Sequence, residues 1–114
     1  MKLTVNGQSF VMESENNALD ESIRSMCPVT LEMTRSGEHE YYAALPKKAD
    51  TRGASETDSV KKDYVYYFAA WNALALVFRD TNITPYKVRI VGRADGISEI
   101  LEKSAGKVNV KLEL

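Results

Sequence analysis

Hydrophobic and polar residues alternate along most of the chain, a pattern typical of β-strands with one buried face. The C-terminal segment is the clearest example, because Val108, Val110, Leu112 and Leu114 alternate with lysine, asparagine and glutamate. Comparable alternation occurs around residues 3–12, 29–34, 40–45 and 86–90. Asn6-Gly7 favours a tight hairpin turn after the first of these segments, because both residue types tolerate positive φ.

Two central segments, 64–68 and 73–78, are apolar at nearly every position. Continuous apolar runs of this length are expected in strands that are covered on both faces. Trp71-Asn72 lies between them and is predicted to form their tight connection. Together with the alternating segments, this gives about eight predicted strands.

Helical spacing occurs in only two places, at residues 17–26 and 95–105. Asn17 is the predicted cap of the first helix and Asp95 that of the second, which Gly106 is expected to end. The apolar stripes consist of Leu19, Ile23 and Met26 in the first helix and Ile97, Ile100, Leu101 and Ala105 in the second. Each stripe is narrow, so both helices are expected to pack on a sheet or close a barrel end.

Residues 47–62 are mostly charged and small, and they are predicted to form a long exposed loop within a single domain of residues 1–114. Hairpin-connected strands favour antiparallel pairing, and about eight twisted strands tend to close or to split into two layers. The predicted fold is mainly β: a closed antiparallel barrel capped by two short helices. A β-sandwich is the alternative.

Composition limits the function classes. The formal net charge is -1, which supplies no basic field for nucleic acid or an anionic membrane. The single cysteine excludes an internal disulfide and a cysteine-based metal cluster. The N-terminus has no apolar core of a signal peptide, and no apolar run approaches the ~20 residues of a membrane span. We therefore expect a cytoplasmic protein without metal, cofactor, nucleic-acid partner or membrane partner.

Several short motifs together resemble a small prokaryotic cyclophilin-like fold family that is distinct from the true cyclophilins. They are Asn17-Ala18, Pro28-Val29-Thr30-Leu31, Glu40 leading to Leu45-Pro46, Asp63, Tyr66-Tyr67, the run Leu74–Phe78, and Gly92-Arg93. The resemblance covers almost the whole chain and implies a cyclophilin-like barrel. Cys27 and Lys62 depart from it, since the family usually has leucine and glycine there; the second departure concerns the turn before Tyr64.

The family resembles peptidyl-prolyl isomerases in fold, but fold alone does not carry function. An isomerase of the cyclophilin type needs an arginine at the prolyl imide and an apolar aromatic floor. Arg79, Arg89 and Arg93 are present, but the arginine-phenylalanine-glutamine run of the true cyclophilins is not. A weak prolyl isomerase therefore remains an alternative and not the leading hypothesis.

The leading hypothesis is a barrel that binds a peptide segment or small ligand without efficient catalysis, and a structural oligomerisation module is a further alternative. The sequence favours no particular oligomeric state. The tyrosines and the tryptophan are the most suggestive residues, although they are also the residues most often packed in a core. The predicted ligand-binding residues are Glu40, Tyr42, Tyr66, Trp71, Phe78 and Arg93, with Glu40 and Arg93 as polar anchors.

Two further groups are interpreted as structural. In Glu38-His39-Glu40, neighbouring strand residues would point to opposite faces, so the segment is predicted to be a solvated turn after Gly37 and not a metal or general-base site. Cys27 follows the C-terminal end of the first helix, where nothing lowers a thiol pKa, and a buried unreactive thiol is expected.

Overall fold

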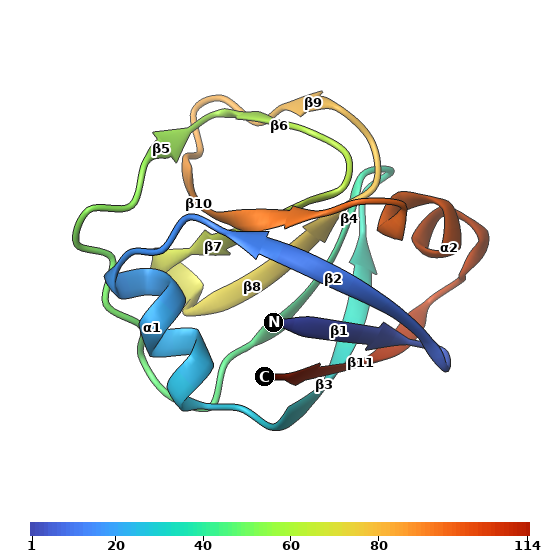
Figure 1. Cartoon of the computed structure of the whole chain (residues 1–114). Coiled ribbons are helices and arrows are strands. Elements are labelled where there is room, and N and C mark those ends of the chain that lie inside the picture. Colours follow the sequence, from blue (N-terminus) through green and yellow to red (C-terminus); the bar gives the residue numbers. More distant parts are fainter.

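The computed structural model describes all residues 1–114 as a closed antiparallel barrel with a helix at each end (Figure 1). The barrel strands are β1 (Lys2–Val5), β2 (Gln8–Ser14), β3 (Val29–Ser36), β4 (Glu40–Ala44), β7 (Tyr64–Phe68), β8 (Ala73–Val77), β10 (Val88–Ala94) and β11 (Lys107–Glu113). These are the eight segments that alternation and apolar runs predicted, and the predicted barrel is confirmed.

The barrel closes through the pairing of β10 with β2, after the order β2-β1-β11-β3-β4-β8-β7-β10. Gly92 lies at this seam opposite Ser14. A Cβ atom on Gly92 would lie 2.4 Å from the backbone oxygen of Glu13, so the two strands can approach this closely only with glycine here.

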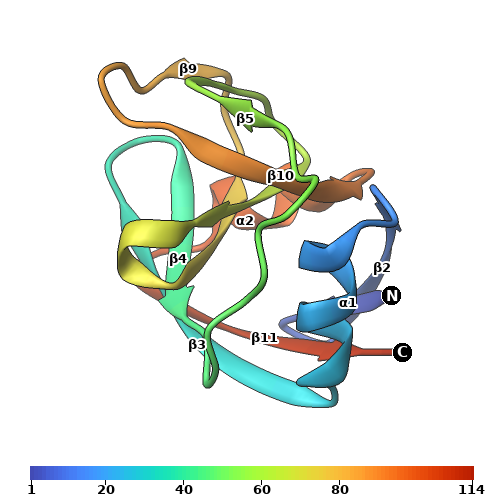
Figure 2. The ribbon, with the colours of Figure 1, turned by 90° about the vertical axis from the view of Figure 1, so that its left-hand side faces the viewer.

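Both helices close the barrel with apolar residues, at opposite ends in Figures 1 and 2. Helix α1 (Ala18–Ser25) buries Leu19 and Ile23, and the Asn17 side chain accepts a hydrogen bond from the Asp20 backbone at 3.0 Å, as the sequence predicted. Helix α2 (Ile97–Lys103) buries Ile97 and Leu101.

The predicted cap of α2 is wrong. Gly96 occupies the N-cap position in the left-handed region, and Asp95 instead pairs with Arg93 at 2.8 Å. The carboxylate that accepts from the first turn is Asp63, whose Oδ1 is 2.9 Å from the Ser98 nitrogen. Although burial raises the pKa of Asp63, hydrogen bonds from Ser98 and Gly96 outweigh it and hold the pKa below its usual range.

The segment 47–62 is not a simple exposed loop. It contains β5 (Glu56–Thr57), which pairs with β10, and β6 (Ser59–Val60), which pairs with β9 (Thr81–Asn82). Its three apolar residues, Ala49, Ala54 and Val60, are all buried. Together with the segment 81–87, it forms an outer layer that lies over the barrel wall at the top of Figure 1.

Two further expectations concern the connections between strands. Trp71-Asn72 does form the link between β7 and β8, as the end of a 3-10 turn (Ala69–Trp71) with Asn72 in the left-handed region. Tyr86, however, is not part of a strand. Its nitrogen donates to the Ile83 oxygen in a turn, and β10 begins only at Val88, because the chain bends around Pro85 before it enters the sheet.

Two apolar clusters result. The first has 24 buried residues and fills the barrel interior, including Tyr41, Tyr67, Leu74 and Leu76. The second is small and lies outside the wall, beneath the outer layer. It consists of Val60, Tyr66, Val77 and Val88, with Tyr64, Phe68, Ile83 and Ile90 packed against them. Strands β7 and β8 are therefore covered on both faces, which explains why they are apolar throughout.

Candidate functional site

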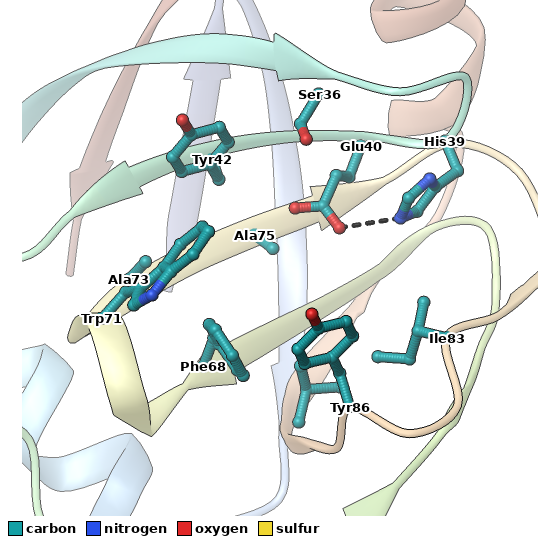
Figure 3. A pocket seen from close by; sticks show the side chains of 11 residues that line it. Ser36, His39, Glu40, Tyr42, Phe68, Trp71, Ala73, Ala75, Ile83 and Tyr86 are labelled. Carbon is teal, nitrogen blue, oxygen red and sulfur yellow. Dashed lines mark ion pairs between the residues drawn. The ribbon is translucent and has the colours of Figure 1, made fainter.

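A hollow of about 310 Å³ opens on the outer face of the wall, beside the edge of the outer layer. Its floor is formed by Ala73 and Ala75, alternate residues of β8 that point away from the barrel (Figure 3). Leu74 lies between these two alanines and Leu76 follows them; both are large side chains that point into the barrel. Because alanine leaves space where its neighbours on adjacent strands are bulky, the floor of the hollow follows directly from the sequence of β8.

Four aromatic side chains surround this floor: Tyr42 from β4, Phe68 from β7, Trp71 from the 3-10 turn and Tyr86 from the outer layer (Figure 3). The ring centroids are 6.1 Å apart for Tyr42 and Trp71, 5.2 Å for Phe68 and Trp71, and 6.2 Å for Phe68 and Tyr86. Trp71 and Tyr86 are 65% and 63% exposed, which is unusual for large aromatic residues and typical of binding surfaces.

The other end of the hollow is polar, with Ser36, His39 and Glu40 (Figure 3). Nε2 of His39 is buried and lies 2.8 Å from Oε1 of Glu40, with no hydrogen-bond partner elsewhere in the protein. The two groups form an ion pair when His39 carries a proton. Both side chains are about four-fifths covered, with exposed fractions of 21% and 24%.

The expectation that His39 and Glu40 point apart is wrong. The predicted turn after Gly37 is confirmed, since it includes His39, but alternation applies only within a strand and therefore does not separate His39 from Glu40, the first residue of β4. Burial raises the pKa of Glu40, and the adjacent His39 lowers it by a smaller amount. Glu40 is therefore a carboxyl group whose charge is poorly solvated.

The structure brings together three of the six predicted site residues: Glu40, Tyr42 and Trp71 all line the hollow. Tyr66 faces the same side of the wall but is only 2% exposed, because the outer layer covers it and its hydroxyl accepts from the Lys61 nitrogen at 2.9 Å. Phe78 packs in the barrel interior with Tyr41. Arg93 lies on β10 near the closing seam, paired with Asp95. Ligand binding by these residues stays a prediction.

The predicted set omitted His39, Phe68, Tyr86 and the two floor alanines. Phe68 shares the alternation of Tyr64 and Tyr66, but the sequence gives no sign of which of them the outer layer covers. The alternation of alanine with leucine from Ala73 to Leu76 was the available signal for a hollow on one face of β8. Tyr86 and His39 lie in turns, where the alternation of residues does not define which way a side chain points.

Other reactive groups lie elsewhere and carry no comparable geometry. Cys27 is partly buried, its thiol donates to the Ile23 oxygen at 3.4 Å, and burial raises its pKa, so it is not an activated nucleophile. None of the histidine, cysteine, aspartate and glutamate side chains gather in the groups of three that a metal ion would need. No helix has both the length and the apolar composition required to cross a membrane.

Comparison with protein families gives one result. The sequence model of a family described as the cyclophilin-like family matches residues 3–113, which is nearly the whole chain and includes every residue that lines the hollow. Comparison with curated proteins found no match.

Proposed function

Because the chain belongs to the cyclophilin-like family, we propose that it functions as a binding barrel whose outer hollow holds a small ligand or an apolar side chain of a peptide, without efficient catalysis. The observation that supports this most directly is the hollow itself. Eight of its 11 lining residues are hydrophobic and a few polar groups gather at one end. Ligand sites typically have volumes of roughly 300–1,000 Å³ and this distribution of groups.

Prolyl isomerisation has less support. It would require an arginine that donates to the twisted amide over an apolar floor. Arg79, Arg89 and Arg93 do not line the hollow; they pair with Glu102, Glu56 and Asp95 respectively. The aromatic surroundings are therefore present without the cation that this reaction needs, and binding is the function that the geometry favours.

The proposal can be tested with N-phenyl-1-naphthylamine, a neutral apolar dye whose fluorescence rises in apolar surroundings. Trp71 is the only tryptophan of the chain and lies at the rim, so energy transfer from Trp71 to the dye reports binding at this site. Saturable binding is expected. Ala75→Leu, which fills the floor, should weaken binding by about tenfold or more, since each lost apolar contact of side-chain size is worth roughly this factor.

The matched control is Val11→Leu, which also adds an apolar group to an outward strand position but lies on β2, away from the hollow. It should leave the dye affinity unchanged. Circular dichroism and thermal melting verify that both variants fold. Equal dye binding by the wild type and Ala75→Leu would contradict the proposal. A stable dimer that dissociates on Trp71→Ser, with no dye binding, would instead support the oligomerisation alternative.

A further inference from the structure

The aromatic side chains of the hollow are close enough to act on one group together. Neighbouring ring centroids are 5.2–6.2 Å apart along the series Tyr42, Trp71, Phe68 and Tyr86. Electron-rich ring faces attract a cation that lies within about 6 Å of the centroid, and the attraction increases when the site excludes water. A single ammonium group that lies over two neighbouring rings can therefore be within this distance of both centroids.

The carboxylate of Glu40 supplies the negative charge that such a site needs. Oε1 contacts His39, whereas the other oxygen has no hydrogen bond or ion pair with the protein and points over the floor toward Ala75 (Figure 3). Because this oxygen faces an apolar hollow, its charge is less well solvated than at an open surface, and a ligand that donates to it or carries a positive charge reduces that cost.

The remaining lining residues add no positive charge, apart from His39 when protonated. The 11 residues around the hollow include neither lysine nor arginine. An anionic ligand would meet Glu40 and the negative ring faces, both of which repel it. A neutral apolar ligand would fit the rings but leave the Glu40 oxygen without a partner. A neutral donor could offer the carboxylate a hydrogen bond, but only a cation with an apolar surface also interacts favourably with its charge and with the ring faces.

Building on the ligand-binding function proposed above, we infer that the ligand of the hollow is a small organic cation, an alkylated ammonium ion. Its alkyl groups lie on Ala73 and Ala75 between the aromatic rings, and its charge faces the free oxygen of Glu40. His39 keeps the carboxylate in place from the opposite side. The rings provide most of the contact surface, and Glu40 and the ring faces together provide the discrimination between charges.

Three probes of nearly identical shape test this inference: choline, its neutral carbon isostere 3,3-dimethyl-1-butanol, and the anion 3,3-dimethylbutanoate. The indole N–H signal of Trp71 in two-dimensional ¹⁵N NMR measures each Kd directly, at constant ionic strength set with sodium chloride. Choline is expected to bind at least about fivefold more tightly than the neutral isostere, and the anion most weakly.

Two variants separate the contributions of charge and rings. In Glu40→Gln, the preference for choline over the isostere should fall by about twofold or more, because the carboxylate charge is lost while the shape and the rings are kept. Phe68→Leu should also reduce the preference, since it replaces a ring by an aliphatic group of similar hydrophobicity. Glu38→Gln is the control, because Glu38 is 81% exposed and does not line the hollow; it should keep the preference.

Equal binding of choline and its isostere by the wild type would overturn the inference, as would a preference in Glu40→Gln that is as large as in the wild type. The naphthylamine result distinguishes this failure from failure of the proposed function. If the dye binds and Ala75→Leu abolishes its binding, the hollow is a ligand site that does not select cations. If the dye does not bind and none of the three probes shifts the Trp71 signal, both proposals fail together.

Discussion

The wall formed by β4, β8 and β7 is packed in opposite ways on its two faces. On the inner face, Tyr41, Val65, Tyr67, Leu74 and Leu76 are almost completely buried and belong to the 24-residue cluster. On the outer face, alanines alternate with these leucines, the outer layer covers only part of the surface, and the hollow remains beside it.

This difference explains the position of the proposed binding site. In some small barrels the ligand enters the interior, which requires that side chains leave it empty. Here large side chains and two helices fill the interior, so ligand-sized space lies on the outside of the wall. The barrel acts as a rigid support, and the site is built from what the outer layer leaves uncovered.

The strongest expected effect comes from emptying the inner face. Leu74→Ala removes a fully buried side chain and should lower the free energy of unfolding by about 2–5 kcal/mol, because it removes apolar contacts and leaves a cavity. Urea unfolding monitored by circular dichroism measures the loss. Ala75→Leu, at the next residue but on the outer face, should change stability much less while it weakens dye binding. A loss below about 1 kcal/mol for Leu74→Ala would show that the interior is not tightly packed.

The inner face was predictable from the sequence because burial on one side imposes a strict alternation. Val108, Val110 and Leu112 follow it, and so do Leu74 and Leu76 once the outer alanines are recognised. The closing seam was harder to predict, since the sequence around Gly92 gives no sign of its contact with Glu13, a residue far away in the chain.

The outer face could be predicted only in part. Tyr64, Tyr66 and Phe68 have the same alternation, yet Tyr66 is covered and Phe68 lines the hollow. The difference depends on where β6 and β9 meet, and neither two-residue strand has a recognisable pattern. Glu40, Tyr42 and Trp71 were predicted at the site, whereas the approach of His39 and Tyr86 depends on turn geometry.

A loss of stability of intermediate size is expected when Asn72 is replaced. This residue contacts the buried Tyr67 and follows Trp71 at the rim of the hollow. Its Nδ2 donates to the oxygens of Leu45 and Lys47 at 3.2 and 2.9 Å, and its Oδ1 accepts from the buried Tyr67 hydroxyl. Asn72→Ala leaves these groups without partners and places alanine at φ 48°, so a loss of about 1–3 kcal/mol is expected in urea unfolding.

Asn72→Gly separates the two causes, because glycine accepts the left-handed backbone but lacks the amide. It should recover part of the loss. Since Asn72 follows Trp71, the alanine variant should also weaken binding of the naphthylamine dye. Unchanged dye binding, despite lower stability, would indicate that the rim of the hollow holds its shape independently of this connection.

The smallest expected effect concerns Glu40 and has a defined pH dependence. Burial raises its pKa in the folded state above the ordinary value of about 4.5, so the folded protein holds a proton that the unfolded chain has already released. Stability therefore falls as the pH rises from that ordinary value through the raised pKa. Glutamine resembles the protonated carboxyl group, so Glu40→Gln should match the wild type near pH 4 and be more stable at pH 7. Urea unfolding at both pH values measures this difference, with Glu38→Gln as the exposed control.

Lower stability of Glu40→Gln at pH 7 would mean that the contact with His39 outweighs the cost of burying the carboxylate. The expected gain would instead show that the ionised carboxylate destabilises the folded protein, which is the cost that a bound cation would relieve.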